Sequence, residues 1–387
     1  MKYDAIVIGA GFSGAVMAER LANQGGKRVL VLEQRNHIGG NCYDYRNEHG
    51  IIVHQYGPHL FHTNKPDVWA YLSQFTQWHE YEHKVLSRVD GKLVPLPFNL
   101  NTLDALYPKS EAEHLTEVLL SEYGEGAKVP ILELRKSQHP ALQQLADVVY
   151  NKFFVNYTAK QWGCRPEAIS PAVTARVPVV VSRDDRYFHD TWQAIPAEGY
   201  TALFKKLLSH SLITVELGVD ATQRVRLNKN DFSVTVDGQP FSGDIIFTGQ
   251  LDALFNYEHG ELPYRSLQFD YETLPTSEFQ PATTVNYPNE EAFTRITEFK
   301  HILPCASDHT TIVREYPQDY DRHDPKRNVP YYPVFTDSNE QAYEAYRNRI
   351  QQYQQVVVLG RLADYKYYNM DDAVANALTL FNQRYGT

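Results

Sequence analysis

The 387-residue sequence contains little cysteine and no long apolar run. Its three cysteines, Cys42, Cys164 and Cys305, are too few and too scattered for a disulfide framework or a metal knuckle, which predicts reduced thiols. No apolar segment approaches the roughly 20 residues of a membrane helix, and the residues after Met1 lead into a predicted strand without a signal-peptide core. We therefore expect a cytoplasmic protein that has no membrane span.

Positive charge is also scarce. The sequence has 37 Lys and Arg against 47 Asp and Glu, a formal net charge of −10, so it offers no basic field that would gather nucleic acid. An anionic small molecule would need local arginines instead. Tyrosine is abundant, with 27 copies, and its flat ring and single hydroxyl suit a site that stacks a base or holds a sugar and a phosphate.

The first 41 residues predict a dinucleotide-binding unit. An apolar strand over residues 4–8 leads into the turn Gly9-Ala10-Gly11-Phe12-Ser13-Gly14, which has the G-x-G-x-x-G pattern and opens a helix over residues 13–23. A second strand over residues 28–33 ends in Glu33, at the position from which a carboxylate accepts the hydroxyls of an adenosine ribose. The glycine turn lies between a predicted strand and a predicted helix, and the second strand and its terminal acid follow at the expected positions. A glycine turn that arose by chance would not have these neighbours.

Each glycine of the turn has a predicted role. Gly9 permits the tight turn, Gly11 lets a pyrophosphate approach the backbone, and Gly14 lets the helix lie close on the sheet. The helix N-terminus then presents free N–H groups and the positive end of its dipole to the phosphates. The pair Gly39-Gly40, before Asn41, indicates a second close approach. This arrangement resembles flavoproteins of the glutathione-reductase and amine-oxidase type, which implies FAD rather than NAD.

The remaining pattern predicts an α/β fold of three parts. We expect a Rossmann-like FAD-binding domain from residues 1–82, 200–252 and 340–387, an inserted helical domain from residues 98–186 with a mobile substrate loop, and a mixed or antiparallel β-sheet domain from residues 83–97, 187–199 and 253–339. In the helical domain, Ser110 and Glu113 suggest a capping box, and the apolar spacing predicts one helix over residues 140–154.

Five segments then make a resemblance specific. Residues 57–63 (GPHLFHT), 157–163 (YTAKQWG), 294–298 (TRITE), 330–333 (PYYP) and 360–367 (GRLADYKY) resemble, in order, the signature segments of bacterial UDP-galactopyranose mutases. The resemblance implies interconversion of UDP-galactopyranose and UDP-galactofuranose with reduced FAD. It further implies a covalent adduct between the anomeric carbon and flavin N5, with no net redox change.

The resemblance also assigns site residues. Arg176 and Arg295 match two diphosphate-binding arginines and, with His59 and His62 near the flavin, are the expected catalytic residues. The expected substrate-binding residues are Tyr157, Trp162, Arg176, Tyr187, Arg295, Tyr332, Tyr367, His83 and Asn369. Of these, His83 and Asn369 depart from the Asn and Asp that the family often carries. The expected cofactor site consists of Gly9, Gly11, Phe12, Ser13, Gly14, Glu33, Gln34, Gly40, Asn41, His59, Val219, Gly360, Arg361, Tyr367 and Met370.

Other readings remain open at this point. An FAD-dependent amine oxidase with net hydride transfer explains the first 41 residues equally well but gives Arg176, Arg295 and the tyrosines no purpose. A non-enzymatic dinucleotide sensor would need only the first domain. A metal site at His59 and His62 is disfavoured, because no further ligands of the right spacing accompany them and Gly57-Pro58 breaks any helix that would align them. The family further implies a homodimer and an external reductant such as NAD(P)H.

Overall fold

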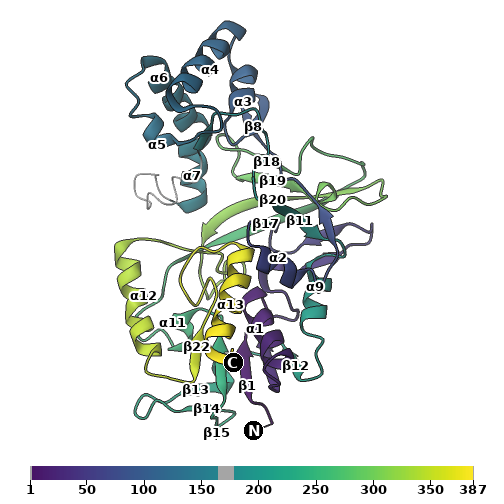
Figure 1. Ribbon diagram of the computed structural model, residues 1–387, viewed down its shortest axis with the longest axis vertical. Coiled ribbons are helices and arrows are strands. Elements are labelled where there is room, and N and C mark those ends of the chain that lie inside the picture. The colour runs from purple at the N-terminus through teal and green to yellow at the C-terminus, as the bar shows by residue number, and fades with distance from the viewer. Residues whose placement is uncertain (1, 164–177, 387) are drawn as a thin grey trace.

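A parallel five-stranded sheet forms the base of the molecule in the computed structural model, which describes residues 2–163 and 178–386 (Figure 1). The strand order is β12 (Ile213–Leu217), β2 (Val29–Glu33), β1 (Ala5–Ile8), β16 (Asp244–Phe247) and β22 (Val356–Val358). All four neighbouring pairs are parallel. Strands from the two ends of the chain, β1 and β22, thus lie in one sheet.

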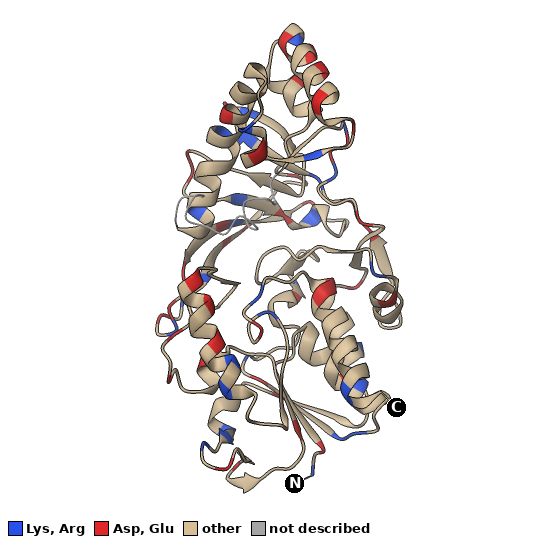
Figure 2. Cartoon of the chain, turned by 60° about the vertical axis from the view of Figure 1, so that its left-hand side comes forward, with Lys and Arg blue, Asp and Glu red and all other residues tan. Residues whose placement is uncertain are grey.

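Both faces of this sheet are covered, because successive side chains of β1 and β2 point to opposite sides and all are buried. One face packs on α1 (Phe12–Asn23), α2 (Pro66–Leu72), α9 (Tyr200–Leu207) and α13 (Met370–Tyr385). The other packs on α10 (Ala221–Arg224), α11 (Leu251–Leu254), α12 (Asp337–Ile350) and the sheet of β13 (Val225–Leu227), β14 (Val234–Val236) and β15 (Gln239–Pro240). Figure 2 shows acidic and basic residues interspersed along the outer helices.

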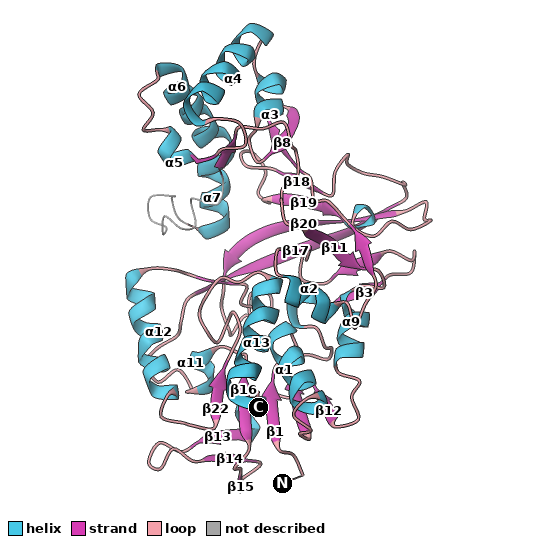
Figure 3. Ribbon diagram, viewed as in Figure 1, coloured by secondary structure: helices cyan, strands magenta, loops and turns pink. Residues whose placement is uncertain are grey.

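A seven-stranded sheet lies above the parallel sheet (Figure 3). Its order is β21 (Tyr332–Pro333), β17 (Tyr264–Leu274), β20 (Thr310–Asp319), β19 (Arg295–Glu298), β18 (Thr284–Asn286), β7 (Val85–Val89) and β8 (Lys92–Leu96). Neighbouring strands are antiparallel except β18 and β7, so the sheet is mixed, as the sequence predicts. Residues 90 and 91, both with positive φ, form the hairpin turn between β7 and β8.

The helical part sits at the β8 edge of this sheet (Figure 1). It comprises α3 (Leu100–Leu106), α4 (Lys109–Tyr123), α5 (Ile131–Leu134), α6 (Pro140–Val149), α7 (Val155–Trp162) and the pair β9 (Lys128–Pro130) and β10 (Pro178–Val180). The predicted helix over 140–154 is interrupted, since residues 150–154 form a π-helical segment between α6 and α7. The predicted capping box is absent, because α4 begins after Pro108 without a side-chain cap.

A small sheet departs from the expected division of the chain. β11 (Trp192–Pro196) pairs with β5 (Phe61–Thr63) and β6 (Trp78–Glu80), not with the seven-stranded sheet to which residues 187–199 were assigned. Stacked rings hold the layer together: Trp78 lies 5.1 Å from Phe61 and 4.6 Å from Trp69 between ring centroids. The remaining elements are β3 (Asp44–Arg46), β4 (Ile52–His54) and the 3₁₀ turns Gly40–Cys42 and Phe299–His301. Within the described residues, no helix is both long and apolar enough to span a bilayer.

Candidate active site

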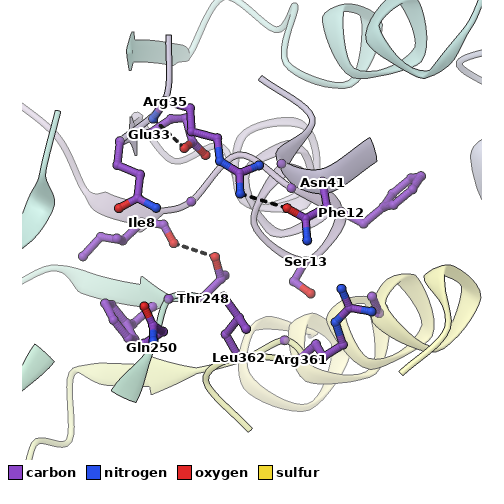
Figure 4. A pocket seen from close by; sticks show the side chains of 18 of the residues that line it. Ile8, Phe12, Ser13, Glu33, Arg35, Asn41, Thr248, Gln250, Arg361 and Leu362 are labelled. Atoms are coloured by element: carbon purple, nitrogen blue, oxygen red, sulfur yellow. Dashed lines mark hydrogen bonds between the residues drawn. The ribbon is translucent and has the colours of Figure 1, made fainter. Parts of the chain in front are cut away.

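A pocket of about 280 Å³, here called the glycine pocket, opens at the carboxyl ends of β1, β2, β16 and β22 (Figure 4). Ligands of open α/β sheets bind at this edge. Glu33, Arg35 and Asn41 lie on one side of it, and Arg361 and Leu362 lie on the other. The expected cofactor residues that line it are Gly9, Gly11, Phe12, Ser13, Glu33, Gln34, Gly40, Asn41, His59, Val219, Gly360, Arg361 and Met370.

The three glycines of the turn differ in what a side chain would meet. A Cβ on Gly9, whose φ is +102°, would lie 2.1 Å from Thr248 Oγ1, and one on Gly14 would lie 1.9 Å from the Gly9 carbonyl oxygen. Gly14 therefore packs helix against strand and does not line the pocket, contrary to its place in the expected cofactor set. A Cβ on Gly11 would meet only Gly40 Cα, at 3.7 Å, so Gly11 leaves space that a ligand can use.

The first turn of α1 and the end of β2 fit a dinucleotide. Gly11 caps α1 without a side-chain hydrogen bond, so the first N–H groups of the helix are available to an anion. The carboxylate of Glu33 is fixed because Ala10 N donates to Oε2 at 2.8 Å and Arg35 N donates to Oε1 at 2.9 Å. Each oxygen keeps a lone pair, which suits a pair of ribose hydroxyls.

A second pocket of about 620 Å³, here called the tyrosine pocket, lies between the two large sheets. It is lined by the expected residues His59, His62, His83, Tyr157, Tyr187, Arg295, Tyr332, Tyr367 and Asn369, drawn from segments far apart in the chain. The two pockets share His59, Arg361, Tyr368, Asn369 and Met370. A group bound at the end of the glycine pocket would therefore meet a group bound in the tyrosine pocket. Tyr367 borders only the tyrosine pocket, so its expected cofactor contact is not supported.

Arg295 is fixed by a carboxylate that sequence reasoning missed. Arg295 on β19 and Glu315 on β20 are paired in register, and Arg295 Nε lies 2.8 Å from Glu315 Oε1. Burial disfavours the charged guanidinium, but Glu315 outweighs it and the pKa of Arg295 is raised, so the cation persists at neutral pH. The Arg295 side chain keeps 30% of its surface exposed, which leaves the guanidinium accessible to an anion in the pocket.

Two tyrosines of this pocket, Tyr157 and Tyr332, are neutral hydrogen-bond donors. Burial raises the pKa of Tyr157 to about 12 and the pKa of Tyr332 further still, so both hydroxyls keep their protons at neutral pH. The rings of Tyr332 and Tyr367 are stacked at 5.4 Å, and the Arg361 guanidinium lies 5.6 Å and 6.0 Å from their centroids. The cluster combines hydroxyl donors with two guanidinium groups, which suits a phosphate-bearing ligand.

His59 stands in the wall shared by both pockets. The backbone N–H of His59 donates to His54 Nδ1 at 3.0 Å, and the ring Nδ1 of His59 donates to the Gly57 carbonyl at 2.9 Å. Burial lowers the pKa of His54 and of His59 to about 3, so both imidazoles are neutral at physiological pH. In the described part of the chain, no group of three or more His, Cys, Asp or Glu side chains is arranged to hold a metal ion.

A third pocket of about 340 Å³ adjoins the tyrosine pocket through Tyr157, Tyr187 and Asn286. It is lined in part by Phe153, Phe154 and Thr158 of the helical part, and we call it the phenylalanine pocket. Two expected substrate residues are not among the described lining of these pockets, for different reasons. Trp162, the last residue of α7, lines none of them, although its ring lies 6.1 Å from that of Tyr332, and Arg176 falls outside the described residues.

The comparisons with known proteins agree with this geometry. The sequence profile of the UDP-galactopyranose mutase family matches residues 152–367, more than half of the chain, and that of an NAD(P)-binding Rossmann-like domain matches residues 7–75. The chain is 34% identical over 387 residues to UDP-galactopyranose mutase of Mycoplasma pneumoniae, covering 99% of this chain and 96% of that protein. The chain belongs to the UDP-galactopyranose mutase family.

Relatives within this family differ in their named substrates. The chain is 33% identical over 375 residues to dTDP-fucopyranose mutase of Escherichia coli, and 96% of each protein is covered. A crystal structure of reduced UDP-galactopyranose mutase has the same fold, with a TM-score of 0.73 at 16% identity, covering 99% of this chain and 94% of that one. Members of the UDP-galactopyranose mutase family are isomerases, so the chain is a mutase rather than an amine oxidase.

Proposed function

We propose that this chain interconverts UDP-galactopyranose and UDP-galactofuranose, with FAD held in the glycine pocket and active in its reduced form. The supporting observation is the shared wall: His59, Arg361 and Met370 border both the pocket that fits a dinucleotide and the pocket that carries Arg295 and the tyrosines. The sugar would therefore lie against the reactive end of the cofactor. When bound, reduced flavin would supply the nucleophile that attacks the sugar.

In this proposal the protein's own groups bind and orient the nucleotide. Arg295 and the hydroxyls of Tyr332 and Tyr367 donate to the diphosphate, whose charge increases as it leaves the sugar. Glu315 keeps the Arg295 guanidinium in place and charged. The phenylalanine pocket, which reaches the diphosphate region through Tyr157, receives the uracil base.

Other elements of the proposal come from the family resemblance alone. Arg176 supplies a second guanidinium to the diphosphate, and an external reductant such as NAD(P)H reduces the flavin. We also propose a cytoplasmic homodimer whose product enters a cell-wall polysaccharide. Size-exclusion chromatography with light scattering tests the dimer, and flavin bleaching under anaerobic NAD(P)H tests the reductant.

The decisive experiment is conversion of UDP-galactofuranose by the purified flavoprotein, reduced with dithionite or left oxidised. We expect turnover only with the reduced enzyme and no net change in the flavin spectrum. Turnover by the oxidised enzyme, or stoichiometric flavin reduction by substrate, would contradict the proposal. The comparison substrate is dTDP-fucopyranose, which the name of the E. coli relative gives. A higher kcat/KM with dTDP-fucopyranose than with the UDP-galactose substrates would change the proposed substrate but not the proposed ring-contraction reaction.

A further inference from the structure

The tyrosine pocket contains histidines that are fixed as one tautomer. His59 Nδ1 lies 2.9 Å from the Gly57 carbonyl, and His62 Nδ1 lies 3.0 Å from the carboxylate of Asp190. Both partners can only accept, so each Nδ1 carries the proton. The neutral imidazole of His59 therefore keeps a lone pair on Nε2, which can accept a hydrogen bond but cannot donate one.

His83 reaches the same state through two hydroxyls. Tyr81 donates its single proton to Thr283 Oγ1 at 2.6 Å, so the Tyr81 oxygen accepts from His83 Nδ1 at 2.9 Å. The backbone is fixed as well, because Tyr187 N donates to the His83 carbonyl at 2.7 Å. Thr283 and Tyr81 thereby place the proton of His83 on Nδ1 and leave the lone pair on Nε2.

Nε2 of His83 is open to the tyrosine pocket. His83 borders that pocket and is 6% exposed. The described hydrogen bond of its ring uses Nδ1, and Nε2 is not one of the fully buried polar atoms that lack a partner. Burial, then the nearby Arg295 cation and His62, lowers the pKa of His83 to about 3, so Nε2 stays unprotonated. Phe188 and Tyr187 lie beside it, each with its ring centroid 5.7 Å from that of His83.

An unprotonated Nε2 discriminates among the parts of a nucleotide sugar. Diphosphate oxygens are acceptors at neutral pH and would be repelled by the lone pair. The base is excluded by position, because His83 does not line the phenylalanine pocket. A sugar hydroxyl is the remaining donor. Loss of such a hydroxyl leaves a buried acceptor unpaired, which is how sites that read a hydroxyl reject analogues without it.

We propose that His83 Nε2 accepts a hydrogen bond from one sugar hydroxyl of the substrate, and that Tyr81 and Thr283 are positioning residues that fix its tautomer. The inference rests on the proposed function for the identity of the sugar nucleotide. The 4-hydroxyl is set aside because its oxygen closes the furanose ring. The candidates are the 2-, 3- and 6-hydroxyls, and the last is the group that distinguishes galactose from fucose.

The test compares UDP-galactopyranose with its 2-, 3- and 6-deoxyfluoro analogues on the reduced FAD-loaded enzyme. Fluorine removes the donor and keeps the size of the substituent. Fluorine also withdraws electrons from the anomeric carbon and should slow turnover in both enzymes, so we expect one analogue to lose an additional factor of roughly 30- to 1,000-fold in kcat/KM in the wild type. In His83→Leu the parent substrate should lose a similar factor, and this additional penalty should fall below about threefold. Equal penalties in both enzymes would overturn the proposal.

Companion variants separate the loss of the hydrogen-bond acceptor at His83 from any structural effect of the substitution. His83→Gln places a carbonyl oxygen near the position of Nε2 and should restore part of the analogue-specific penalty. His49→Leu, a histidine that stacks on His309 outside the three pockets, is the matched control and should keep the wild-type pattern. Tyr81→Phe should weaken the penalty while UDP affinity changes less than about threefold. Unchanged selectivity in Tyr81→Phe would remove the positioning role.

A spectroscopic measurement distinguishes the possible failures. In ¹⁵N NMR of the holoenzyme, His83 should show a protonated Nδ1 and an unprotonated Nε2 at pH 7, and Tyr81→Phe should mix the tautomers. A protonated Nε2 would overturn the inference while leaving the proposed function intact. Absence of turnover of every nucleotide sugar by the wild type would overturn the proposed function itself and, with it, the role of His83 in reading a sugar.

Discussion

The glycine pocket and the tyrosine pocket recognise their ligands in opposite ways. The glycine pocket depends largely on main-chain groups and on the absence of side chains. The N-terminus of α1 has no side-chain cap, and a Cβ added at Gly11 would meet only Gly40 Cα, at 3.7 Å. The tyrosine pocket depends on side chains, and its ion pair joins two strands in register. The glycine turn of the first lies within one short segment, whereas the ion pair of the second requires β19 and β20 to be assembled in register.

The largest expected effect tests the glycine pocket. Gly11→Val should abolish FAD retention, because the new side chain fills the space that the pyrophosphate needs while the extended backbone of Gly11 accepts a side chain without strain. The measurement is the flavin absorbance per chain after gel filtration. The variant should remain folded by circular dichroism.

Gly14→Val is the informative contrast. Its Cβ would lie 1.9 Å from a carbonyl oxygen of the chain itself, so this variant should lose the fold and not only the cofactor. Stoichiometric FAD in Gly11→Val would show that the dinucleotide lies elsewhere.

The next effect belongs to the tyrosine pocket. Arg295→Ala should lower kcat/KM roughly 30- to 1,000-fold, which corresponds to about 2–4 kcal/mol of lost transition-state stabilisation. Part of this loss should appear in kcat, because the departing diphosphate gains negative charge. Arg295→Lys keeps a cation beside Glu315 but loses the planar fork, and it should also be badly impaired. Both variants should bind FAD normally, since Arg295 does not line the glycine pocket.

Near wild-type turnover in either variant would place the diphosphate elsewhere. The double variant Arg295→Ala, Glu315→Gln addresses a second explanation, because removing Arg295 alone leaves a buried carboxylate unpaired. If the double variant regains thermal stability but not activity, the loss belongs to the diphosphate contact.

The same contrast explains what could be predicted from the sequence. The parallel sheet, its first two strands and the glycine turn follow from local pattern, because each feature is set by residues within one βαβ unit. Glu315 could not be found this way, since only the register between β19 and β20 places it against Arg295. The pairing of β11 with β5 and β6 was likewise missed, because tertiary packing of distant aromatic rings selects it.

A smaller effect is expected for single hydroxyls of the tyrosine pocket. Tyr332→Phe preserves the stack with Tyr367 and removes one donor, which should lower kcat/KM by about 1–2 kcal/mol, roughly 5- to 30-fold. Steady-state kinetics with UDP-galactofuranose measures it. Tyr353→Phe is the control, because the buried Tyr353 hydroxyl has no described hydrogen-bond partner and its removal should leave turnover unchanged.

A different kind of effect concerns the wall that both pockets share, because it appears as a pH dependence of stability and not in turnover. His54 holds the backbone of His59, and burial keeps the pKa of both near 3, below the ordinary value of 6.5. Between these values the unfolded chain binds more protons than the folded one, so stability is present above pH 6.5 and is lost as the pH falls. Each histidine contributes a slope of up to about 1.4 kcal/mol per pH unit.

His54→Asn can keep the acceptor for His59 N and removes the titrating group, so the free energy of unfolding should fall less steeply between pH 6.5 and 4.5. His301→Asn is the contrast of opposite sign. His301 donates a hydrogen bond from Nε2 to the Glu298 carboxylate, which raises the pKa of His301, so its stabilisation is present below pH 6.5 and is lost as the pH rises through the folded pKa. Urea titrations at several pH values measure both slopes. If His54→Asn leaves the acid slope unchanged, protonation of other groups causes the loss of stability at low pH, and the two pockets do not share an acid-sensitive wall.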